Sequence, residues 1–231
     1  MRLDKYLSQA TGISRSQVRK LIRDGEASVD GEVVKNAAFN LAEGARVSLT
    51  GDEIDPPATR YFMLHKPAGY VCANKDPEHP TVLDLLWQEP RPDNLQIVGR
   101  LDADTTGLLL ITDDGQWNHR ITSPRTDTPK TYWVQLARPL DEAQAEQLRA
   151  GIFLRNEEQR TKPAILEIIT PEQVRITISE GRYHQVRRMF AALGNHVEAL
   201  HRERIGSITL DSTLEPGDYR PLTDAEIASI D

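Results

Sequence analysis

An acidic, proline-containing segment near residue 55 divides this chain into two parts of unequal length. Residues 51–59 contain three acidic residues and two prolines and show no apolar periodicity. This composition is typical of a linker. We therefore predict a small N-terminal domain over residues 1–50, a linker over residues 51–59 and a larger domain over residues 60–231. The 231 residues of the chain are enough for two such domains.

The composition is that of an ordinary globular protein, with 39% hydrophobic and 27% charged residues. No apolar run approaches the length of a membrane-spanning helix, and the first residues lack the apolar core of a signal peptide. We therefore expect a cytoplasmic protein that contacts no membrane. The single cysteine, Cys72, excludes an internal disulfide and a zinc site built from several cysteines.

The N-terminal part has the pattern of two helices followed by short strands. Apolar residues at helical spacing over 3–10 predict a helix that ends at the next glycine. Ser14, followed three residues later by a glutamine, predicts a capping box that opens a second helix, and Gly25 ends it. Residues 27–34 have the pattern of a hairpin around an Asp-Gly turn, and residues 47–49 predict one more strand.

The second of these helices carries a basic stripe opposite its apolar face. Arg15, Arg19 and Arg23 are spaced four residues apart, with Lys20 beside them. Such a stripe is ordinarily a solvated helix face. Without interleaved acids, however, it forms poor salt bridges within the helix and a good track for phosphates. The net charge of −7 is a weak argument against a nucleic-acid partner, because the basic residues are clustered.

The first fifty residues resemble the alpha-L RNA-binding domain, which occurs in a small-subunit ribosomal protein and in several RNA-modifying enzymes. The resemblance runs from Arg2 through Gly31. It implies that the four basic residues of the stripe contact an RNA backbone. These residues are Arg15, Arg19, Lys20 and Arg23.

In the larger part, short apolar runs alternate with helix patterns. Mixed local and long-range pairing of this kind indicates an α+β fold around a largely antiparallel sheet. The predicted strands cover residues 61–64, 108–111, 132–136, 165–169 and 174–178, and the predicted helices cover residues 141–151 and 184–193.

Three charged residues, Arg100, Asp102 and Asp104, crowd into the loop just before the apolar run 108–111. Loops held by a rigid sheet often carry catalytic groups, although an acidic cluster before a strand is also common in solvated turns. Residues 99–107 resemble the catalytic loop of the RNA pseudouridine synthases. The resemblance implies that Asp102 is the catalytic carboxylate. The planar guanidinium of Arg100 is suited to fill the gap that a flipped-out nucleotide leaves in the base stack.

Lys130 and Tyr132 form a second motif. Strand alternation places both side chains on one face, where a tyrosine is ordinarily a core residue. The motif resembles the second motif of the same family, which implies that Tyr132 contacts the target base beside Lys130 in the substrate site. Two roles are open to Tyr132: stacking on the uracil, or proton transfer during the rearrangement.

Residues 178–189 run from a strand through Gly181 into a helix and resemble the third motif of the family. The resemblance implies that Arg187 pairs with the catalytic carboxylate and that Leu200 lines the base pocket. A neighbouring guanidinium favours the ionised form of a carboxylate and fixes its orientation. His184 is interpreted as a surface histidine.

The resemblance spans essentially the whole chain and implies an isomerase that converts a uridine of 16S ribosomal RNA to pseudouridine. The substrate is small-subunit RNA, either naked or in an assembling particle, and we expect a monomer. The target base must be flipped out of the folded RNA. No cofactor or metal is expected, because the reaction needs neither a redox change nor a group donor. Attack on the ribose, attack on the base and assistance to elimination all remain open for the carboxylate.

Two functions of other classes are weaker explanations of the same residues. A catalytically silent RNA-binding assembly factor explains residues 1–50 but not the order of Asp102, Tyr132 and Arg187. A hydrolase would use Asp102 together with Asp104 as paired acids. Loss of activity in Asp102→Asn with retained RNA affinity excludes the first, and released free base would favour the second.

Overall fold

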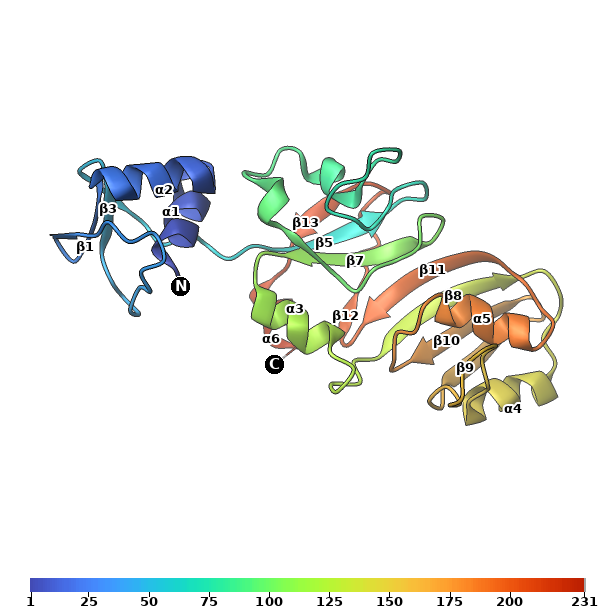
Figure 1. Ribbon diagram of the computed structural model, residues 1–231. Helices are drawn as coiled ribbons and strands as arrows, with labels where there is room; N and C mark the ends of the chain where they lie inside the picture. Colours follow the sequence, from blue (N-terminus) through green and yellow to red (C-terminus); the bar gives the residue numbers. More distant parts are fainter. Residues whose placement is uncertain (231) are drawn as a thin grey trace. The chain divides into compact units, whose positions relative to one another are not determined.

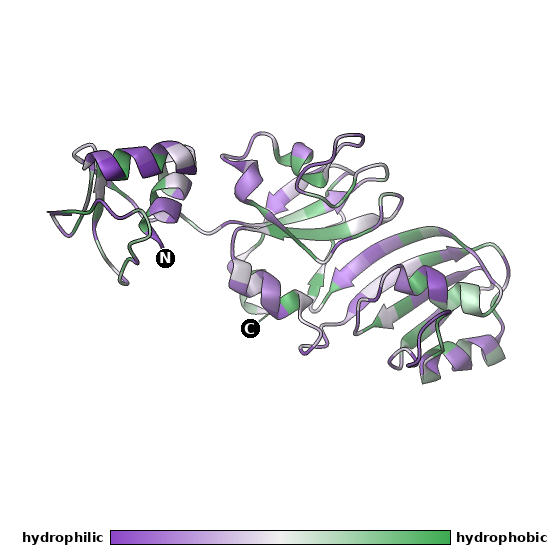
Figure 2. Ribbon diagram, viewed as in Figure 1, coloured by the Kyte–Doolittle hydropathy of each residue, from purple (hydrophilic) through white to green (hydrophobic). Residues whose placement is uncertain are grey.

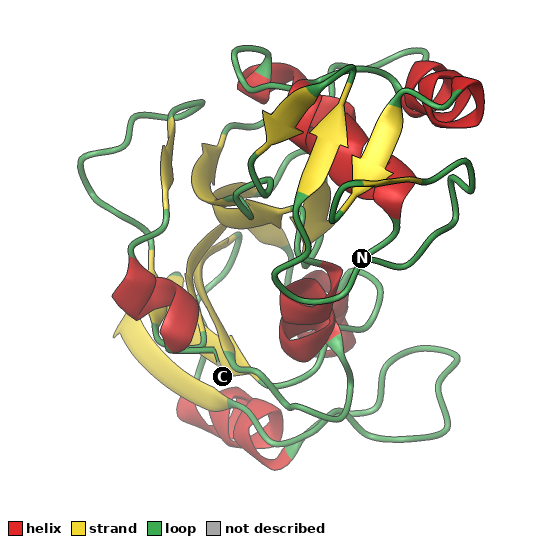
Figure 3. Cartoon of the chain, turned by 90° about the vertical axis from the view of Figure 1, so that its left-hand side faces the viewer, coloured by secondary structure: helices red, strands yellow, loops and turns green. Residues whose placement is uncertain are grey.

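The computed structural model describes residues 1–230 and contains the mixture of helices and strands that the sequence predicts (Figures 1 and 3). Contacts within the chain divide it into two compact units. The N-terminal unit comprises residues 1–59 and 88–94, and the C-terminal unit comprises residues 60–87 and the chain from residue 95 onward. The short 3-10 helix Pro92–Asn94 belongs to the N-terminal unit.

The N-terminal unit has two helices and a four-stranded sheet in the order β2-β1-β3-β4. Both helices begin and end where the sequence predicts. The hydroxyl of Ser14 accepts a hydrogen bond from the Gln17 N–H at 3.3 Å, and Gly25 ends the second helix in the left-handed conformation. The elements are α1 (Leu3–Thr11), α2 (Arg15–Asp24), β1 (Ala27–Val29), β2 (Glu32–Val33), β3 (Val47–Leu49) and β4 (Asp52–Ile54).

Strand β4 lies inside the segment that the sequence predicts to be a linker, so that prediction is wrong for residues 52–54. The strand pairs antiparallel with β3. The two residues between them, Thr50 and Gly51, both have positive φ angles, of 53° and 93°, as a tight hairpin turn requires. The exposed acidic residues of this short edge strand show no apolar alternation, which is why the sequence gives no signal for it. Residues 55–60 have no regular secondary structure.

The helices of the N-terminal unit bury a narrow apolar stripe against its sheet. Figure 2 shows α2 as mostly hydrophilic, interrupted by hydrophobic residues. Val18 and Ile22 of this stripe are fully buried, together with Leu3 and Leu7 of α1 and Val47 of β3. A small core of this kind stabilises a unit of fewer than seventy residues only modestly.

The C-terminal unit is built on a nine-stranded sheet with the path β13-β5-β7-β11-β8-β10-β9, from which β6 and β12 branch. Its neighbouring strands are antiparallel except for the pair β7 and β11. This arrangement confirms the predicted α+β fold with a mostly antiparallel mixed sheet. The strands are β5 (Tyr61–Lys66), β6 (Gln96–Val98), β7 (Thr106–Thr112), β8 (Lys130–Leu136), β9 (Ile165–Thr170), β10 (Gln173–Ile178), β11 (Val197–Ile205), β12 (Ile208–Thr209) and β13 (Tyr219–Pro221).

Helices cover both faces of this sheet, so β7 is buried on each side. Leu109 and Ile111 lie in the larger apolar core, which includes residues of α4 and α5. Leu108 and Leu110 lie in a second core with Trp117 of α3. The helices are η1 (Val82–Leu86), α3 (Gly115–Thr122), α4 (Glu142–Ala150), α5 (Gln185–Ala192) and α6 (Asp224–Ala228), and Figure 1 shows α4 and α5 beside β8, β9 and β10.

The parallel pair of β7 and β11 positions the loop that precedes β7. Thr106 is paired with His201, and Gly107 with Arg202. A Cβ atom on Gly107 would lie 2.3 Å from the Arg202 carbonyl oxygen, and the residue has a φ of 106°. Only glycine permits this close approach and this conformation. Two segments about a hundred residues apart in the sequence are thereby held side by side.

Candidate active site

A cleft of about 1030 Å³ opens in the C-terminal unit beside the loop 99–105. The loop forms one wall, and the turn that joins β10 to α5 forms another. All six residues that the sequence predicts to be catalytic or substrate-binding line this cleft. They are Arg100, Asp102, Lys130, Tyr132, Arg187 and Leu200.

The carboxylate of Asp102 lies between two side chains from the start of α5. His184 Nε2 is 3.2 Å from Asp102 Oδ1, and Arg187 Nε is 3.7 Å from Asp102 Oδ2. The guanidinium of Arg187 also lies 3.0 Å from the carboxylate of Asp104. Arg187 is therefore beside Asp102, as predicted, but its shorter contact is with Asp104.

His184 is the contact with Asp102 that the sequence interpretation missed. The residue precedes α5 in the left-handed conformation, with φ 48° and ψ 35°, which non-glycine residues adopt rarely and mostly where the surroundings enforce it. A usable signal was its spacing. His184 and Arg187 are three residues apart at a helix N-terminus, and residues at that spacing lie on the same side.

Two further hydrogen bonds fix the Arg187 side chain. Its guanidinium donates to the Val197 carbonyl at 3.1 Å and to the Thr105 hydroxyl at 3.4 Å. These contacts join α5 to the first residue of β11 and to the loop before β7. The guanidinium is thus oriented by the protein before any ligand is present.

The buried side chain of Lys66 binds the backbone of the loop 99–105. Its side chain is fully buried, and its ammonium group donates to the carbonyls of Pro67 at 2.9 Å, Ala103 at 3.1 Å and Thr105 at 2.8 Å. Burial lowers the pKa of Lys66, although the charges of Cys72, Asp104 and Asp102 oppose that shift. Two of its three acceptors flank Asp104, so Lys66 fixes the backbone that carries the loop carboxylates.

Arg202 joins the first residue of the same loop to the strand β7 that follows the loop. The residue is 1% exposed. Its guanidinium donates to the Leu108 carbonyl at 2.8 Å and to the Gly99 carbonyl at 2.7 Å. Arg202 thus holds the start of the loop, and Lys66 holds its second half at Ala103 and Thr105. The sequence interpretation used neither Arg202 nor Lys66, although a charged residue within an apolar strand pattern is an available signal.

Tyr132 and Lys130 extend from β8 into the cleft. Tyr132 is 8% exposed, and the guanidinium carbon of Arg202 lies 6.0 Å from the centre of its ring. Lys130 donates to the Thr128 carbonyl at 3.0 Å. Burial, assisted by the charge of Arg202, lowers the pKa of Lys130 to about 8. Tyr132 is therefore a buried part of the cleft wall, and Lys130 is a half-buried ammonium group whose pKa lies below that of an ordinary lysine.

The remaining two predicted residues occupy opposite environments in the same cleft. Arg100 is exposed on the loop, where its side chain is free to contact a large ligand. Leu200 is 6% exposed and belongs to the larger apolar core. One therefore provides a cation at the mouth and the other an apolar surface inside.

In the N-terminal unit, a carboxylate from α1 forms ion pairs with two residues of the basic stripe on α2. The side chain of Asp4 in α1 is fully buried, and its carboxylate lies 3.0 Å from Arg15 Nη2 and 2.8 Å from Arg19 Nε. Arg2 completes the group at 3.1 Å. Lys20, Arg15, Arg19 and Arg23 are all exposed. Burial raises the pKa of Asp4, but hydrogen bonds from Arg19 and Arg15 outweigh it, so the net shift is downward.

Within residues 1–230, no group of three or more His, Cys, Asp or Glu side chains is placed to hold a metal ion. In the same range, no helix combines the length and the apolar character needed to cross a membrane.

The fold, the loop with its carboxylates and the order of the motifs correspond to a known family. Residues 60–192 match the family model of RNA pseudouridylate synthase, and residues 1–47 match that of the S4 domain. The chain therefore belongs to the RNA pseudouridylate synthase family and carries an N-terminal S4 domain. The prediction of an isomerase of this family with such a domain is confirmed.

The relatives of the chain are similar to it over their full length. Ribosomal small subunit pseudouridine synthase A of Escherichia coli (strain K12) is 58% identical over 231 residues, which is 100% of each chain. The protein of the same name from Vibrio parahaemolyticus is 56% identical over 100% of this chain and 99% of its own. A crystal structure of a pseudouridylate synthase matches with a TM-score of 0.72 and 47% identity, covering 100% of this chain and 99% of that one.

Proposed function

We propose that this protein isomerises one uridine of 16S ribosomal RNA in the small subunit to pseudouridine. The observation that carries the proposal is the cleft in which Asp102, Tyr132 and Arg187 converge from three separate segments of the chain. The names of the relatives that are 58% and 56% identical over the full chain support the choice of small-subunit RNA.

Asp102 is the catalytic carboxylate in this proposal. The reaction breaks the bond between N1 of the base and C1′ of the ribose and forms a bond from C5 to C1′, while C5 loses a proton and N1 gains one. A carboxylate serves this exchange as a nucleophile or as the anion that assists cleavage. Arg187 and His184 approach the two oxygens of Asp102 from one helix end and orient it.

The rest of the cleft binds the uridine. Its apolar part, with Leu200, receives the uracil, and the buried ring of Tyr132 contacts the base by stacking or by passing a proton through its hydroxyl. Lys130 lies beside the same ligand. The target must leave the RNA stack to reach Asp102, and the exposed guanidinium of Arg100 takes its place there.

The N-terminal unit supplies a sequence-independent contact with the RNA. Arg15, Arg19, Lys20 and Arg23 are exposed on one helix and contact phosphates of the backbone. We further propose that the enzyme acts as a monomer in the cytoplasm, on naked RNA or on an assembling particle. The domain boundary between this unit and the catalytic part lies after β4, between residues 55 and 60.

The test is a map of pseudouridine in unmodified 16S RNA, and in its assembling particle, after incubation with the protein. The wild type, Asp102→Asn and the control Asp218→Asn, an exposed carboxylate outside the cleft, are compared. The proposal expects one new site with the wild type and the control and none with Asp102→Asn. The substrate that acquires the site identifies the natural form of the RNA.

Other outcomes favour the two alternative functions. Tight binding to both substrates without a modified site would indicate a silent assembly factor. Release of free uracil would indicate a hydrolase that uses Asp102 with Asp104, whose carboxylates both lie near Arg187.

A further inference from the structure

Tyr183 is an exposed aromatic side chain on the rim of the cleft. It is 77% exposed, although it belongs to the segment that lines the cleft. A single exposed aromatic residue is ordinary on a protein surface. Two further observations, the stacking of its ring and the rigidity of its backbone, distinguish Tyr183 from such a residue.

The ring of Tyr183 stacks on the ring of His184. The two ring centres are 3.8 Å apart and the planes differ by 20°. His184 in turn contacts the carboxylate of Asp102 at 3.2 Å. One face of the tyrosine is therefore covered by a residue that touches the proposed catalytic group, and its high exposure leaves the other face open.

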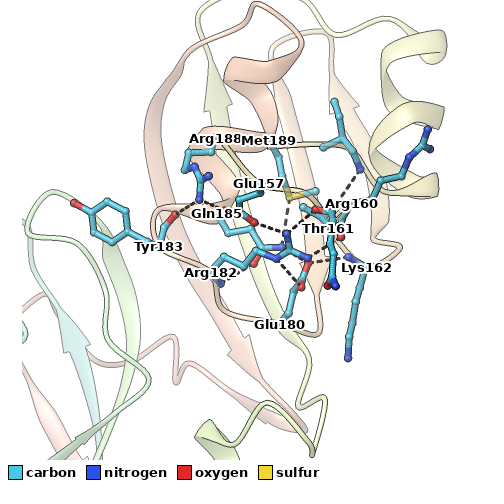
Figure 4. Close-up of polar contacts among 12 residues, drawn as sticks. Glu157, Arg160, Thr161, Lys162, Glu180, Arg182, Tyr183, Gln185, Arg188 and Met189 are labelled. Atoms are coloured by element: carbon cyan, nitrogen blue, oxygen red, sulfur yellow. Dashed lines mark hydrogen bonds and ion pairs between the residues drawn. The ribbon is translucent and has the colours of Figure 1, made fainter. Parts of the chain in front are cut away.

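The turn that carries Tyr183 is fixed on its inner side by a network of charged and polar contacts (Figure 4). Arg182 forms ion pairs with Glu157 and with Glu180, the latter at 3.1 Å. Gln185 accepts a hydrogen bond from the Arg182 N–H at 2.9 Å and donates to Glu180 at 2.7 Å. The backbone on both sides of Tyr183 is thereby held in place.

A further contact holds Tyr183 itself. Arg188 donates to the Tyr183 carbonyl at 3.1 Å and pairs with Glu157 at 2.6 Å. Figure 4 shows the tyrosine ring pointing away from this cluster. Because carboxylates pair with the guanidinium groups of Arg182 and Arg188, the part of the turn that extends outward is an aromatic face rather than an unpaired positive charge.

We propose that the open face of Tyr183 stacks on the nucleobase next to the target uridine in the RNA chain. This inference rests on the proposed function, because it needs a flipped nucleotide at Asp102. Flipping removes one stacking partner from each of the two neighbouring bases, and proteins commonly replace such partners with aromatic side chains. In this proposal Arg100 covers one neighbour and Tyr183 covers the other. The fixed turn and the stacked His184 ring hold Tyr183 in one orientation, so little conformational entropy is lost on binding.

The test uses an RNA fragment that contains the target uridine, together with versions in which the 5′ or the 3′ neighbour lacks its base. Tyr183→Ala is expected to raise KM for the intact fragment about tenfold, with a smaller change in kcat. Tyr183→Phe keeps the ring and is expected to restore most of the affinity. Trp87→Ala is the control, because Trp87 is 73% exposed and lies outside the cleft.

The decisive result is the coupling between the variant and the missing base. We expect one of the two abasic fragments to raise the wild-type KM by the same factor as Tyr183→Ala, and Tyr183→Ala to add nothing on that fragment. An unchanged KM of Tyr183→Ala, or factors that multiply on both abasic fragments, would overturn the inference. Failure of the proposed function is distinguishable, because the wild type would then form no pseudouridine on the intact fragment.

Discussion

The two units of this protein use buried charge in opposite ways. In the N-terminal unit, the buried carboxylate of Asp4 holds the exposed guanidinium groups of Arg15 and Arg19. In the C-terminal unit, the buried cations of Lys66 and Arg202 hold the loop that carries the half-buried carboxylate of Asp102 and the exposed carboxylate of Asp104. In each unit a buried charge therefore fixes part of the proposed functional surface, directly in the N-terminal unit and through the loop backbone in the C-terminal unit.

The partners of the buried charges differ, and so do the consequences. Asp4 contacts the side chains that we propose to bind RNA, so it orients them and also neutralises part of their charge. The hydrogen bonds of Lys66 and Arg202 described above go only to backbone carbonyls. Asp102 is therefore positioned without losing its charge to the groups that position the loop. This difference suits a loose electrostatic contact in one unit and accurate placement of a reacting group in the other.

Removing the Lys66 ammonium group is expected to have the largest effect of the changes that test this comparison. Lys66→Met leaves the carbonyls of Ala103 and Thr105 without this donor and loosens the loop. Misplacement of a reacting group by about 1 Å costs on the order of 100-fold in rate. We therefore expect kcat to fall about 100-fold while KM changes little, as measured by pseudouridine formation under steady-state conditions.

The control for this variant is Lys75→Met, which removes an exposed lysine outside the cleft. Thermal unfolding of both variants shows whether the fold is retained. A folded Lys66→Met enzyme with wild-type kcat would show that the buried cation does not position the loop.

The next largest effect is expected for Asp4→Asn, which acts on stability. An asparagine cannot pair with the charges of Arg15 and Arg19, and loss of hydrogen bonds to charged groups costs about 1–2 kcal/mol here. Since the folded-state pKa of Asp4 lies below its ordinary value of 3.8, the wild-type advantage is present above that pH and is lost as the pH falls through the folded pKa.

Denaturant unfolding of the N-terminal unit within the full chain, at pH 7 and at about pH 2, measures this effect. The difference between wild type and Asp4→Asn is expected at pH 7 and is expected to shrink at the lower pH. An equal difference at both values would mean that the charge of Asp4 is not what stabilises the unit.

Salt dependence of RNA binding separates the free members of the basic stripe from those that contact Asp4. The logarithm of the affinity falls as the logarithm of the salt concentration rises. Each phosphate contact that is lost lowers the steepness of this fall by about 1. We expect the double variant Lys20→Ala, Arg23→Ala to lower it by about 2. We expect Arg15→Ala, Arg19→Ala to lower it less, because Asp4 already neutralises part of their charge.

This experiment is a binding titration at several salt concentrations, with Lys75→Ala as the control. If neither double variant changes the slope, the stripe is only a solvated helix face. If both lower it equally, the neutralising effect of Asp4 is refuted.

The smallest effect on stability is expected for Lys130. Burial of its ammonium group disfavours the charged form and lowers its pKa. Its folded-state pKa of about 8 lies below the ordinary 10.5, so the unfolded chain binds more protons between these values. Stability is therefore lowest below pH 8 and rises as the pH increases towards 10.5. Lys130→Met removes this penalty and should stabilise the protein by about 1 kcal/mol at pH 7, after allowance for solvent screening.

Unfolding free energies of wild type and Lys130→Met at pH 7 and pH 10 check this prediction. The gain from the substitution is expected to be smaller at pH 10. A gain that is the same at both values would attribute it to packing of the methionine rather than to removal of the charge.

The local elements were predictable from the sequence because their signals are local. Ser14 and Gly25 define the ends of α2, and Asp141 forms a capping box at the start of α4. The predicted strands over residues 165–169 and 174–178 are confirmed as β9 and β10. The catalytic and substrate-binding residues that the family resemblance implies all line one cleft. Their chemical roles stay predictions.

The features that the sequence does not predict depend on contacts between distant segments. The periodicity of apolar residues carries no information about such contacts. The partner of Arg15 and Arg19 lies on another helix, and the parallel pairing of β7 with β11 joins segments about a hundred residues apart. Strand β4 was missed because a short, acidic edge strand has no apolar alternation. His184 is exposed, as interpreted, but its contact with Asp102 was missed because that contact depends on where the start of α5 meets the loop.

The most direct test of the central claim follows the hydrogen at C5 of the target uridine. Small-subunit RNA labelled with tritium at C5 of uridine loses that tritium to water when pseudouridine forms, because C5 bonds to the ribose. We predict stoichiometric release of one tritium per RNA by the wild type, and none by Asp102→Asn, which still binds the RNA with wild-type affinity. Release by Asp102→Asn at a rate near that of the wild type would contradict the assignment of the catalytic carboxylate and, with it, the purpose assigned to the buried cations beneath the loop.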